Sequence, residues 1–543
     1  MAKKLEEVEW IKDHTGSTLP NAENRVKMRD LLNETGPGFC LAKWTQVTMH
    51  LGNGLTHSCH HPHAHKIPLD ELKDNPSALH NTIFKKQRRK EMLTGKRPTE
   101  CDFCWRVEDN GEISDRVLKS LPSFSSPHYN KIKDLDGDED IYPTYVEVSF
   151  GNTCNFACAY CGPAFSSKWQ QDVEKNGAYT VLNEHYNAIN KNEVHIPNRE
   201  ENPYIEAFWK WFPEAYKHMH TFRITGGEPL LLKDTFKVMD FLAENPNPVL
   251  EFSINTNACP PGDKWNEFVK KVNYLTENNC IKKFDLFVSA EATGDRCDYI
   301  RDGMDWKMFK TNVEYFLENT TNTRVNFMAA FNILSLSTLK ELLEWVLELK
   351  KIHSWNGMAG WFEEKGFIKS MPGSKSYKDR KGKQHSRVGI DIPYVRSPTF
   401  LDANITSKEL VKKYLIPALE FMYENVGTPD FYGTNKFEDW ECLKLKRNVV
   451  DLILKTDQLD EDGLHTNKEM KLTRGKFANF IQQYDKRRNK KFLEVFPEYE
   501  EFYNTCITEY QAIWGTDKTD VTFEKYKQQQ LEDTKNAKDI PSK

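Results

Sequence analysis

The sequence of 543 residues lacks any apolar run of the length needed to cross a bilayer. Its first residues, MAKKLEEVEWIKDHTG, are charged and contain no apolar segment of the kind found in secretory signals. The net charge is small, −5, with both signs mixed along the chain, so composition gives no reason to expect a nucleic-acid partner. These absences predict a cytoplasmic protein without a membrane partner.

Hydrophobic residues make up 38% of the chain and charged residues 29%, which is typical of a globular protein with a substantial core. No internal repeat is visible, and the acidic stretch KDLDGDEDIYP (133–143) is typical of a domain boundary. The pattern predicts five segments: an extension (1–35), a compact cysteine-bearing domain (36–110), a linker (111–142), a core domain (143–400) and a mostly helical region (401–543).

The chain has 12 cysteines, and seven of them lie in two closely spaced groups. In a large intracellular chain, clustered cysteines bind metal or act in redox chemistry more often than they form disulfides. The five scattered cysteines are typical of small buried hydrophobic residues. The two groups therefore carry the chemical information.

From residue 143 onward, short β-rich runs alternate with amphipathic helical segments. The runs are YVEVSF (145–150), TFRIT (221–225), LEFSIN (250–255), FDLFVSA (284–290), RVNFMAAFNI (324–333) and a possible sixth, GIDIPYVRSPTF (389–400). This alternation predicts an α/β fold with a parallel sheet and helices outside it, either open or closed as a barrel. Six strands are too few for a complete eight-unit barrel.

The stretch SFGNTCNFACAYCGPAF places Cys154, Cys158 and Cys161 in a C-x3-C-x2-C loop directly after the first strand. Three thiolates this close cannot all lie on one face of a helix or strand, but from a loop they can bind three corners of a small cube-shaped cluster. A 4Fe–4S cluster normally takes four cysteines, so three leave one iron open to a non-protein ligand. A zinc site completed by His185 or His195 is the weaker alternative.

This loop, with an aromatic residue before its last cysteine, resembles that of the radical S-adenosylmethionine (SAM) superfamily. The sequence GGEP follows TFRIT and is similar to the glycine-rich SAM-binding motif of that superfamily; it contains Gly226, Gly227 and Glu228. Glycines let backbone approach a ligand closely, and carbonyls with Glu228 can accept hydrogen bonds from an ammonium group. The resemblance implies a partial (β/α)6 TIM-like barrel and a 4Fe–4S cluster whose open iron chelates SAM.

Two further strand ends resemble the same superfamily. INTNA (254–258) is similar to its asparagine-bearing third strand end, which implies that Asn255 contacts SAM. VSAEATGDRCDYIR (288–301) resembles the subgroup that modifies peptides and sulfatases. That match implies that Ser289 and Arg301 hold the SAM carboxylate, with Glu291 near the ribose; a surface ion pair is the alternative for Arg301.

The second cysteine group begins at a predicted hairpin. Asn53–Gly54, flanked by alternating apolar and polar residues, is a strong hairpin signal that places Thr48 opposite Cys59. A helix-like segment and a C-x2-C pair follow, which completes a set of four cysteines: Cys40, Cys59, Cys101 and Cys104. Four cysteines suffice for one tetrahedral zinc or one fully ligated cluster.

The spacing C-x13-G-x4-C from Cys40 through Gly54 to Cys59 resembles the opening half of the SPASM/twitch auxiliary-cluster domain, which also carries a later C-x2-C. Here it precedes the core, so the chain is most similar to radical SAM proteins with an N-terminal twitch domain. The resemblance implies an auxiliary 4Fe–4S cluster at 36–110, with zinc as the alternative.

The tract HSCHHPHAH (57–65) looks at first like a metal site of its own. In the predicted hairpin only Cys59 is a ligand, and His57 shares its face of the strand. The remaining histidines run on into a proline-containing loop and are expected to be incidental: His60, His61, His63 and His65.

The leading functional hypothesis is a radical SAM enzyme. The resemblance implies reductive cleavage of SAM to a 5′-deoxyadenosyl radical, which abstracts hydrogen from a peptide or from a small sugar or alcohol. It also implies an electron donor such as a flavodoxin or ferredoxin, and an auxiliary cluster that anchors substrate or relays an electron. Two alternatives are a non-catalytic iron–sulfur and SAM-binding scaffold or sensor, and a radical SAM core with a structural zinc module at 36–110.

Overall fold

The computed structural model describes residues 22–122, 124–190, 193–197, 200–353, 387–427, 435–454 and 468–514. The first part of the predicted extension, 1–21, and the end of the predicted helical region, 515–543, lie outside the described residues. Among the helices that are described, none is both long and apolar enough to cross a membrane.

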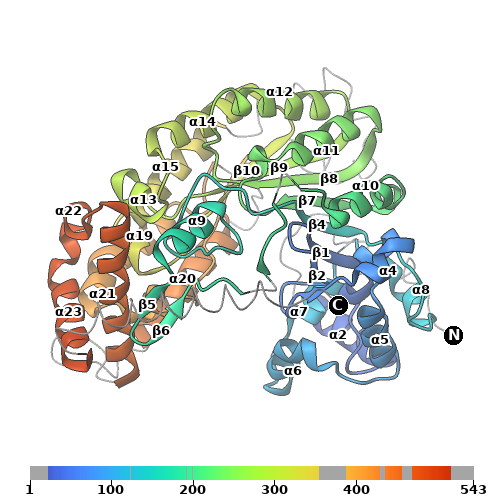
Figure 1. Ribbon diagram of the computed structural model, residues 1–543, viewed down its shortest axis with the longest axis horizontal. Coiled ribbons are helices and arrows are strands. Elements are labelled where there is room, and N and C mark those ends of the chain that lie inside the picture. The colour runs from blue at the N-terminus through green and yellow to red at the C-terminus, as the bar shows by residue number, and fades with distance from the viewer. Residues whose placement is uncertain are drawn as a thin grey trace.

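A nine-stranded sheet runs through the molecule in the order β11-β10-β9-β8-β7-β4-β1-β2-β3 (Figure 1). Six of its strands pair in parallel and lie where the sequence predicts them: β4 (Tyr145–Ser149), β7 (Thr221–Thr225), β8 (Asn247–Thr256), β9 (Ile281–Ser289), β10 (Thr323–Met328) and β11 (Val388–Asp391). The α/β fold with a central parallel sheet is therefore confirmed. The strand order is open, with β11 at one end and β3 at the other.

Helices between these strands cover one face of the sheet (Figure 1). They are α10 (Pro203–Ala215), α11 (Lys233–Glu244), α12 (Lys264–Glu277), α14 (Trp306–Asn319) and α15 (Leu339–Ile352). Two further helices, α9 (Ser167–Asn176) and α13 (Gly294–Ile300), also fall between these strands in the sequence. On that face Phe222 packs on Phe212 of α10, and Phe284 packs on Phe268 of α12. Because side chains alternate along a strand, the residues between them point to the other face.

The other face of the parallel sheet is polar. It carries Glu147, Arg223, Ser253 and Asp285 on four adjacent strands, while their neighbours in sequence are buried and apolar. A parallel sheet covered by helices on both faces has near-continuous apolar strands instead. The alternation therefore indicates one face that packs against helices and one that lines a polar space.

An N-terminal unit extends the sheet beyond β4. Its strands are β1 (Gln46–His50), which pairs in parallel with β4, and the antiparallel β2 (Leu55–His57) and β3 (His65–Lys66). Its helices are α2 (Ala22–Thr35), α3 (Ala42–Thr45), α4 (Leu69–Asp74), α5 (Ile83–Leu93), α6 (Asp102–Asp109), α7 (Asp115–Ser120) and α8 (Tyr129–Lys133). A separate apolar core draws on residues from Met28 to Ile132.

The hairpin of this unit exists, but its predicted register is wrong. Thr48 pairs with His57, not with Cys59, so four residues connect β1 to β2. The reason is Leu51, which is fully buried and donates its backbone N–H to Ser149 O of β4. Leu51 therefore continues the pairing with β4, and the pairing of β1 with β2 ends at His50. Cys59 consequently lies in the loop after β2 and not on a strand.

The described parts of the C-terminal region are mostly helical. Its helices are α18 (Lys408–Leu410), α19 (Ile416–Glu424), α20 (Asp439–Leu454), α21 (Lys468–Arg488), α22 (Phe492–Val495) and α23 (Glu500–Trp514). In Figure 1 the helices α21 to α23, in red, and the N-terminal unit, in blue, lie at opposite ends of the molecule. A small hairpin, β5 (Tyr179–Val181) and β6 (Glu184–Tyr186), packs beside α21.

Candidate functional site

The predicted core-site residues follow neighbouring parallel strands at one edge of the sheet. The cysteine loop comes after β4, the GGEP turn after β7, Asn255 lies near the end of β8, and Ser289 ends β9. Because the carboxyl ends of parallel strands meet at one edge, these segments are brought together there. The structure thus assembles residues that span more than a hundred positions of sequence.

The backbone of the cysteine loop is fixed by bonds to distant segments. Ala157 N–H donates to Asp302 O and Ala159 N–H to Ile300 O, both at 2.7 Å. The Trp169 indole N–H donates to Cys158 O, also at 2.7 Å. A loop with its amides and carbonyls satisfied in this way holds its side chains in a fixed arrangement.

The three loop thiols interact electrostatically with one another and are only partly exposed. Burial raises the pKa of Cys154 to about 12 and that of Cys158 to about 11. Buried thiols of this kind become thiolates when a metal takes the place of the proton, so the donor set fits an iron–sulfur cluster.

The GGEP turn packs directly against the segment that precedes Cys154. Gly227 N–H donates to Gly151 O and Glu228 N–H to Thr153 O. A Cβ atom on Gly227 would lie 2.4 Å from Thr153 O, and Gly226 has a φ of +123°, which favours glycine. The glycines thus allow close approach of two backbone segments of the protein itself.

The Glu228 side chain is fully buried and connects two strand ends. Its Oε1 accepts from Leu230 N–H at 3.0 Å and from the Thr256 hydroxyl at 2.7 Å, and its Oε2 accepts from Asn257 N–H at 2.6 Å. Burial raises the pKa of this carboxyl to about 7, although the three donors oppose the rise. The carboxylate therefore fixes the end of β8 relative to the GGEP turn.

Glu228→Gln is expected to loosen this connection. One acceptor oxygen becomes an NH2 group that faces a donor, which costs about 1–3 kcal/mol of the free energy of unfolding. Thermal unfolding under anaerobic conditions measures the loss, and Glu244→Gln on an exposed position of α11 is the control. An unchanged unfolding temperature for the Glu228 variant would contradict the role assigned to these bonds.

Glu291 and Arg301 form a buried ion pair beside the cysteine loop. Arg301 donates to Glu291 Oε2 from Nε at 3.0 Å and from Nη2 at 2.8 Å, and the Tyr160 hydroxyl donates to the same oxygen at 3.1 Å. Arg301 Nη1 also lies 3.8 Å from Cys158 Sγ, and Nη2 contacts the Tyr160 hydroxyl. Arg301 is thus buried against the loop, and the alternative of a surface ion pair is wrong.

The Oε1 atom of Glu291 is buried and has no hydrogen-bond partner among the described residues. A buried acceptor without a donor is costly, so it is a position where a ligand donor is favoured. This oxygen belongs to the carboxylate that, by the resemblance to the superfamily, lies near the SAM ribose.

Asn255 and Ser289 lie on the polar face of the sheet. Asn255 Oδ1 accepts from Arg223 Nε at 2.9 Å, and the Arg223 guanidinium stacks on the Phe287 ring at 4.2 Å from its centroid. Ser289 is half-buried and pairs in the ladder with Met328. Their side chains share one face because they alternate with the buried residues of β8 and β9.

The C-terminal helix α21 supports the cysteine loop, which sequence reasoning missed. Arg488 stacks on the Trp169 ring and forms an ion pair with Asp302 at 3.3 Å. The Tyr484 hydroxyl donates to Tyr299 O at 3.0 Å, next to the segment that binds the loop amides. No local sequence signal marks these contacts, because each joins residues more than 180 positions apart.

In the N-terminal unit the structure brings the four predicted cysteines together. A small cavity, partly open to solvent, is lined by Cys40, Cys59, Cys101 and Cys104. They come from the segment before α3, the loop after β2, and the start of α6. Burial raises the pKa of Cys101 to about 11 and that of Cys104 to about 12.

A buried lysine lies near these cysteines. Lys43 is 3% exposed, forms an ion pair with Glu100, and interacts electrostatically with Cys101 and Cys59. Burial alone would lower the pKa of Lys43, but the neighbouring anionic groups outweigh it and raise that pKa. A buried cation favours thiolates, so the cavity suits an anionic metal–thiolate centre.

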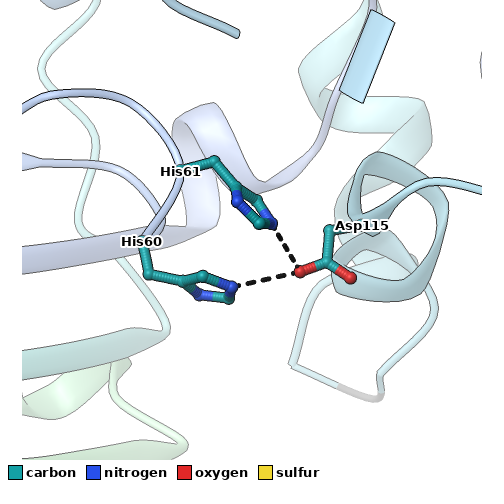
Figure 2. Close-up of side chains that lie close together, drawn as sticks. All are labelled: His60, His61 and Asp115. Atoms are coloured by element: carbon teal, nitrogen blue, oxygen red, sulfur yellow. Dashed lines mark hydrogen bonds and ion pairs between the residues drawn. The ribbon is translucent and has the colours of Figure 1, made fainter. Parts of the chain in front are cut away.

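Two histidines of the 57–65 tract have a partner that the sequence analysis did not predict. His60 and His61 both bond through Nε2 to Oδ2 of Asp115, at the start of α7 (Figure 2). His65, in β3, bonds to the Thr82 hydroxyl. The sequence separation of 54 residues between His61 and Asp115 explains why no local pattern revealed the contact.

The fold and this edge of the sheet define an α/β protein with a three-cysteine loop and a glycine-rich turn side by side. Residues 148–346 match the model of the Radical SAM superfamily, so this part of the chain is a radical SAM superfamily domain. A solved structure, the crystal structure of Streptococcus suis SuiB bound to S-adenosylmethionine, is similar at 13% identity and a TM-score of 0.26. That similarity covers 65% of this chain and 74% of SuiB. No curated protein matches the chain.

Proposed function

We propose that this protein is a radical SAM enzyme whose reaction centre lies at the carboxyl edge of the parallel sheet. The observation that carries the proposal is the meeting of the cysteine loop, the GGEP turn and the Glu291–Arg301 pair within the matched domain. When bound there, a 4Fe–4S cluster and SAM supply reductive cleavage of SAM to methionine and a 5′-deoxyadenosyl radical, which abstracts hydrogen from the substrate.

The chain's own residues would hold these groups as follows. Cys154, Cys158 and Cys161 are the proposed iron ligands, since their buried thiols require a metal to ionise. SAM is proposed to lie against Gly226, Gly227, Glu228, Asn255, Ser289, Glu291 and Arg301. The orphan Oε1 of Glu291 supports this placement, because a ribose hydroxyl would give it the donor it lacks.

The polar face of the sheet is the proposed substrate side, and the six parallel strands are proposed to curve around it as a partial barrel. Glu147 and Arg223 lie there with about a quarter and a fifth of their side chains exposed, so both can reach a bound molecule. Partly exposed hydrogen-bonding and charged groups of this kind suit a peptide or a small sugar or alcohol as the substrate. An electron donor such as a flavodoxin or ferredoxin is proposed to reduce the cluster.

For the N-terminal cavity we propose an auxiliary 4Fe–4S cluster in a twitch-like domain. The spacing C-x13-G-x4-C from Cys40 to Cys59, with the later C-x2-C pair, resembles that of twitch domains and supports iron–sulfur over zinc. The cavity that the four thiols line, with the buried cation Lys43 nearby, suits an anionic metal–thiolate centre.

Iron counting and SAM cleavage together test the proposal. Anaerobically reconstituted protein should hold about eight irons, as expected for two four-iron clusters, and should form 5′-deoxyadenosine and methionine with dithionite and SAM. Cys101→Ala should hold about four irons and still cleave SAM, because the two cysteine groups are separate. About four irons with one zinc in the parent protein would show that the N-terminal cavity binds zinc and not an auxiliary cluster. Eight irons without SAM cleavage would favour a scaffold or sensor.

A further inference from the structure

The pair of consecutive histidines after Cys59 converges on one carboxylate. His60 Nε2 lies 3.1 Å and His61 Nε2 lies 2.7 Å from Asp115 Oδ2. Figure 2 shows both rings directed toward the same oxygen from the loop after β2, with Asp115 opposite them on α7. Adjacent residues of an extended chain point to opposite sides, so this loop has turned both imidazoles to one point.

Packing holds the rings in this arrangement. The His61 ring stacks on Phe103 with centroids 3.8 Å apart and an interplanar angle of 11°, and its side chain is 14% exposed. The two histidine rings are 4.2 Å apart, and the buried Pro62 follows them directly. The donor atoms are therefore preorganised, which lowers the entropic cost of binding a ligand between them.

We propose that His60, His61 and Asp115 form a binding site for a divalent transition-metal ion of the Zn²⁺ type, separate from the four-cysteine centre. Imidazole nitrogen and carboxylate oxygen are ligands that Zn²⁺ accepts in proteins, at bond lengths of about 2.0–2.2 Å. Tetrahedral geometry at that length sets ligand atoms about 3.3 Å apart. The two nitrogen–oxygen distances need only small adjustments to reach it, and the three ligand atoms already lie within 4.8 Å of one another.

The ion would connect the loop that carries Cys59 to helix α7. His61 and Asp115 also line the four-cysteine cavity, so the ion would brace one wall of that cavity. Three protein ligands leave a coordination position open, and water can reach the ion because the His60 side chain is 58% exposed. The ion would thus stabilise this wall of the cavity, with water as its fourth ligand.

Zinc binding to the iron-loaded protein tests the site. Equilibrium dialysis with ZnCl₂, with iron measured in the same samples, should show one zinc per chain that binds at micromolar concentration or below. His60→Ala and Asp115→Asn should weaken that binding at least tenfold without loss of iron. His63→Ala, an exposed histidine of the same loop, should bind as the parent does.

X-ray absorption at the zinc edge identifies the ligands. Nitrogen and oxygen neighbours at about 2.0 Å, without sulfur at about 2.3 Å, support the site. A sulfur neighbour would place the zinc among the cysteines and overturn the proposal. Absence of zinc binding in the parent protein, or equal binding in the His60 and Asp115 variants, would overturn it as well. Each of these outcomes is independent of whether the protein cleaves SAM, because iron content and cleavage are measured separately.

Discussion

Cys158→Ala is expected to reduce SAM cleavage to the level seen without protein. Cys158 is the middle ligand of the proposed three-cysteine set, and its sulfur lies 3.8 Å from Arg301 Nη1. A cluster left with two protein ligands loses both an iron–sulfur bond and its fixed position relative to the SAM residues. The measurement is 5′-deoxyadenosine formed per chain after anaerobic reconstitution and addition of dithionite, together with the iron content.

Cys280→Ala is the matched control for this experiment. Cys280 is also buried, but it lies directly before β9 and therefore at the opposite edge of the sheet from the cysteine loop. Among the described residues, its sulfur has long contacts with the carbonyls of Ala243 and Asn278. The control should lose little stability and should cleave SAM as the parent does. Full cleavage by the Cys158 variant would contradict the assignment of the loop as the cluster ligand.

The parts of the fold that the sequence predicted are those with a local physical signal. Alternation of apolar and polar residues in β4, β7 and β9 follows from one helix-covered face and one polar face, so the strands were found at their positions. The cysteine loop was found because three thiols at short spacing have few structural uses. The GGEP turn is predicted from its resemblance to the superfamily motif at the end of a predicted strand, and the structure shows that Gly227 also approaches the backbone of Thr153 closely.

The features that the sequence did not predict depend on contacts between distant segments. The hairpin register differs because Leu51 donates to Ser149 O, a residue nearly a hundred positions away. The His61–Asp115 contact and the support of the cysteine loop by Arg488 likewise join remote segments. Such contacts depend on how whole helices and strands pack against one another, and a short stretch of sequence carries no information about that packing.

Glu291→Gln is expected to cost stability and also to impair SAM binding. The substitution keeps the side-chain shape but leaves the Arg301 charge buried without a counter-ion, and breaking a buried pair costs about 3–5 kcal/mol. It also puts an NH2 group in place of one carboxylate oxygen. That oxygen is either the Oε1 without a partner or the Oε2 that accepts from both Arg301 and Tyr160. We expect a lower unfolding temperature, a higher Kd for SAM and less 5′-deoxyadenosine per folded chain.

A second buried ion pair provides the control that distinguishes a loss of stability from a loss of SAM binding. Lys350 and Glu441 are both fully buried at 2.9 Å, between α15 and α20, and neither belongs to the cysteine loop or to the strand ends around it. Glu441→Gln should lower the unfolding temperature by a similar amount and leave the Kd for SAM unchanged. Equal Kd values in the parent and both variants would show that Glu291 acts only in folding. A raised Kd in the Glu291 variant alone would tie its carboxylate to the ligand, because the cost of a lost buried charge pair is common to both.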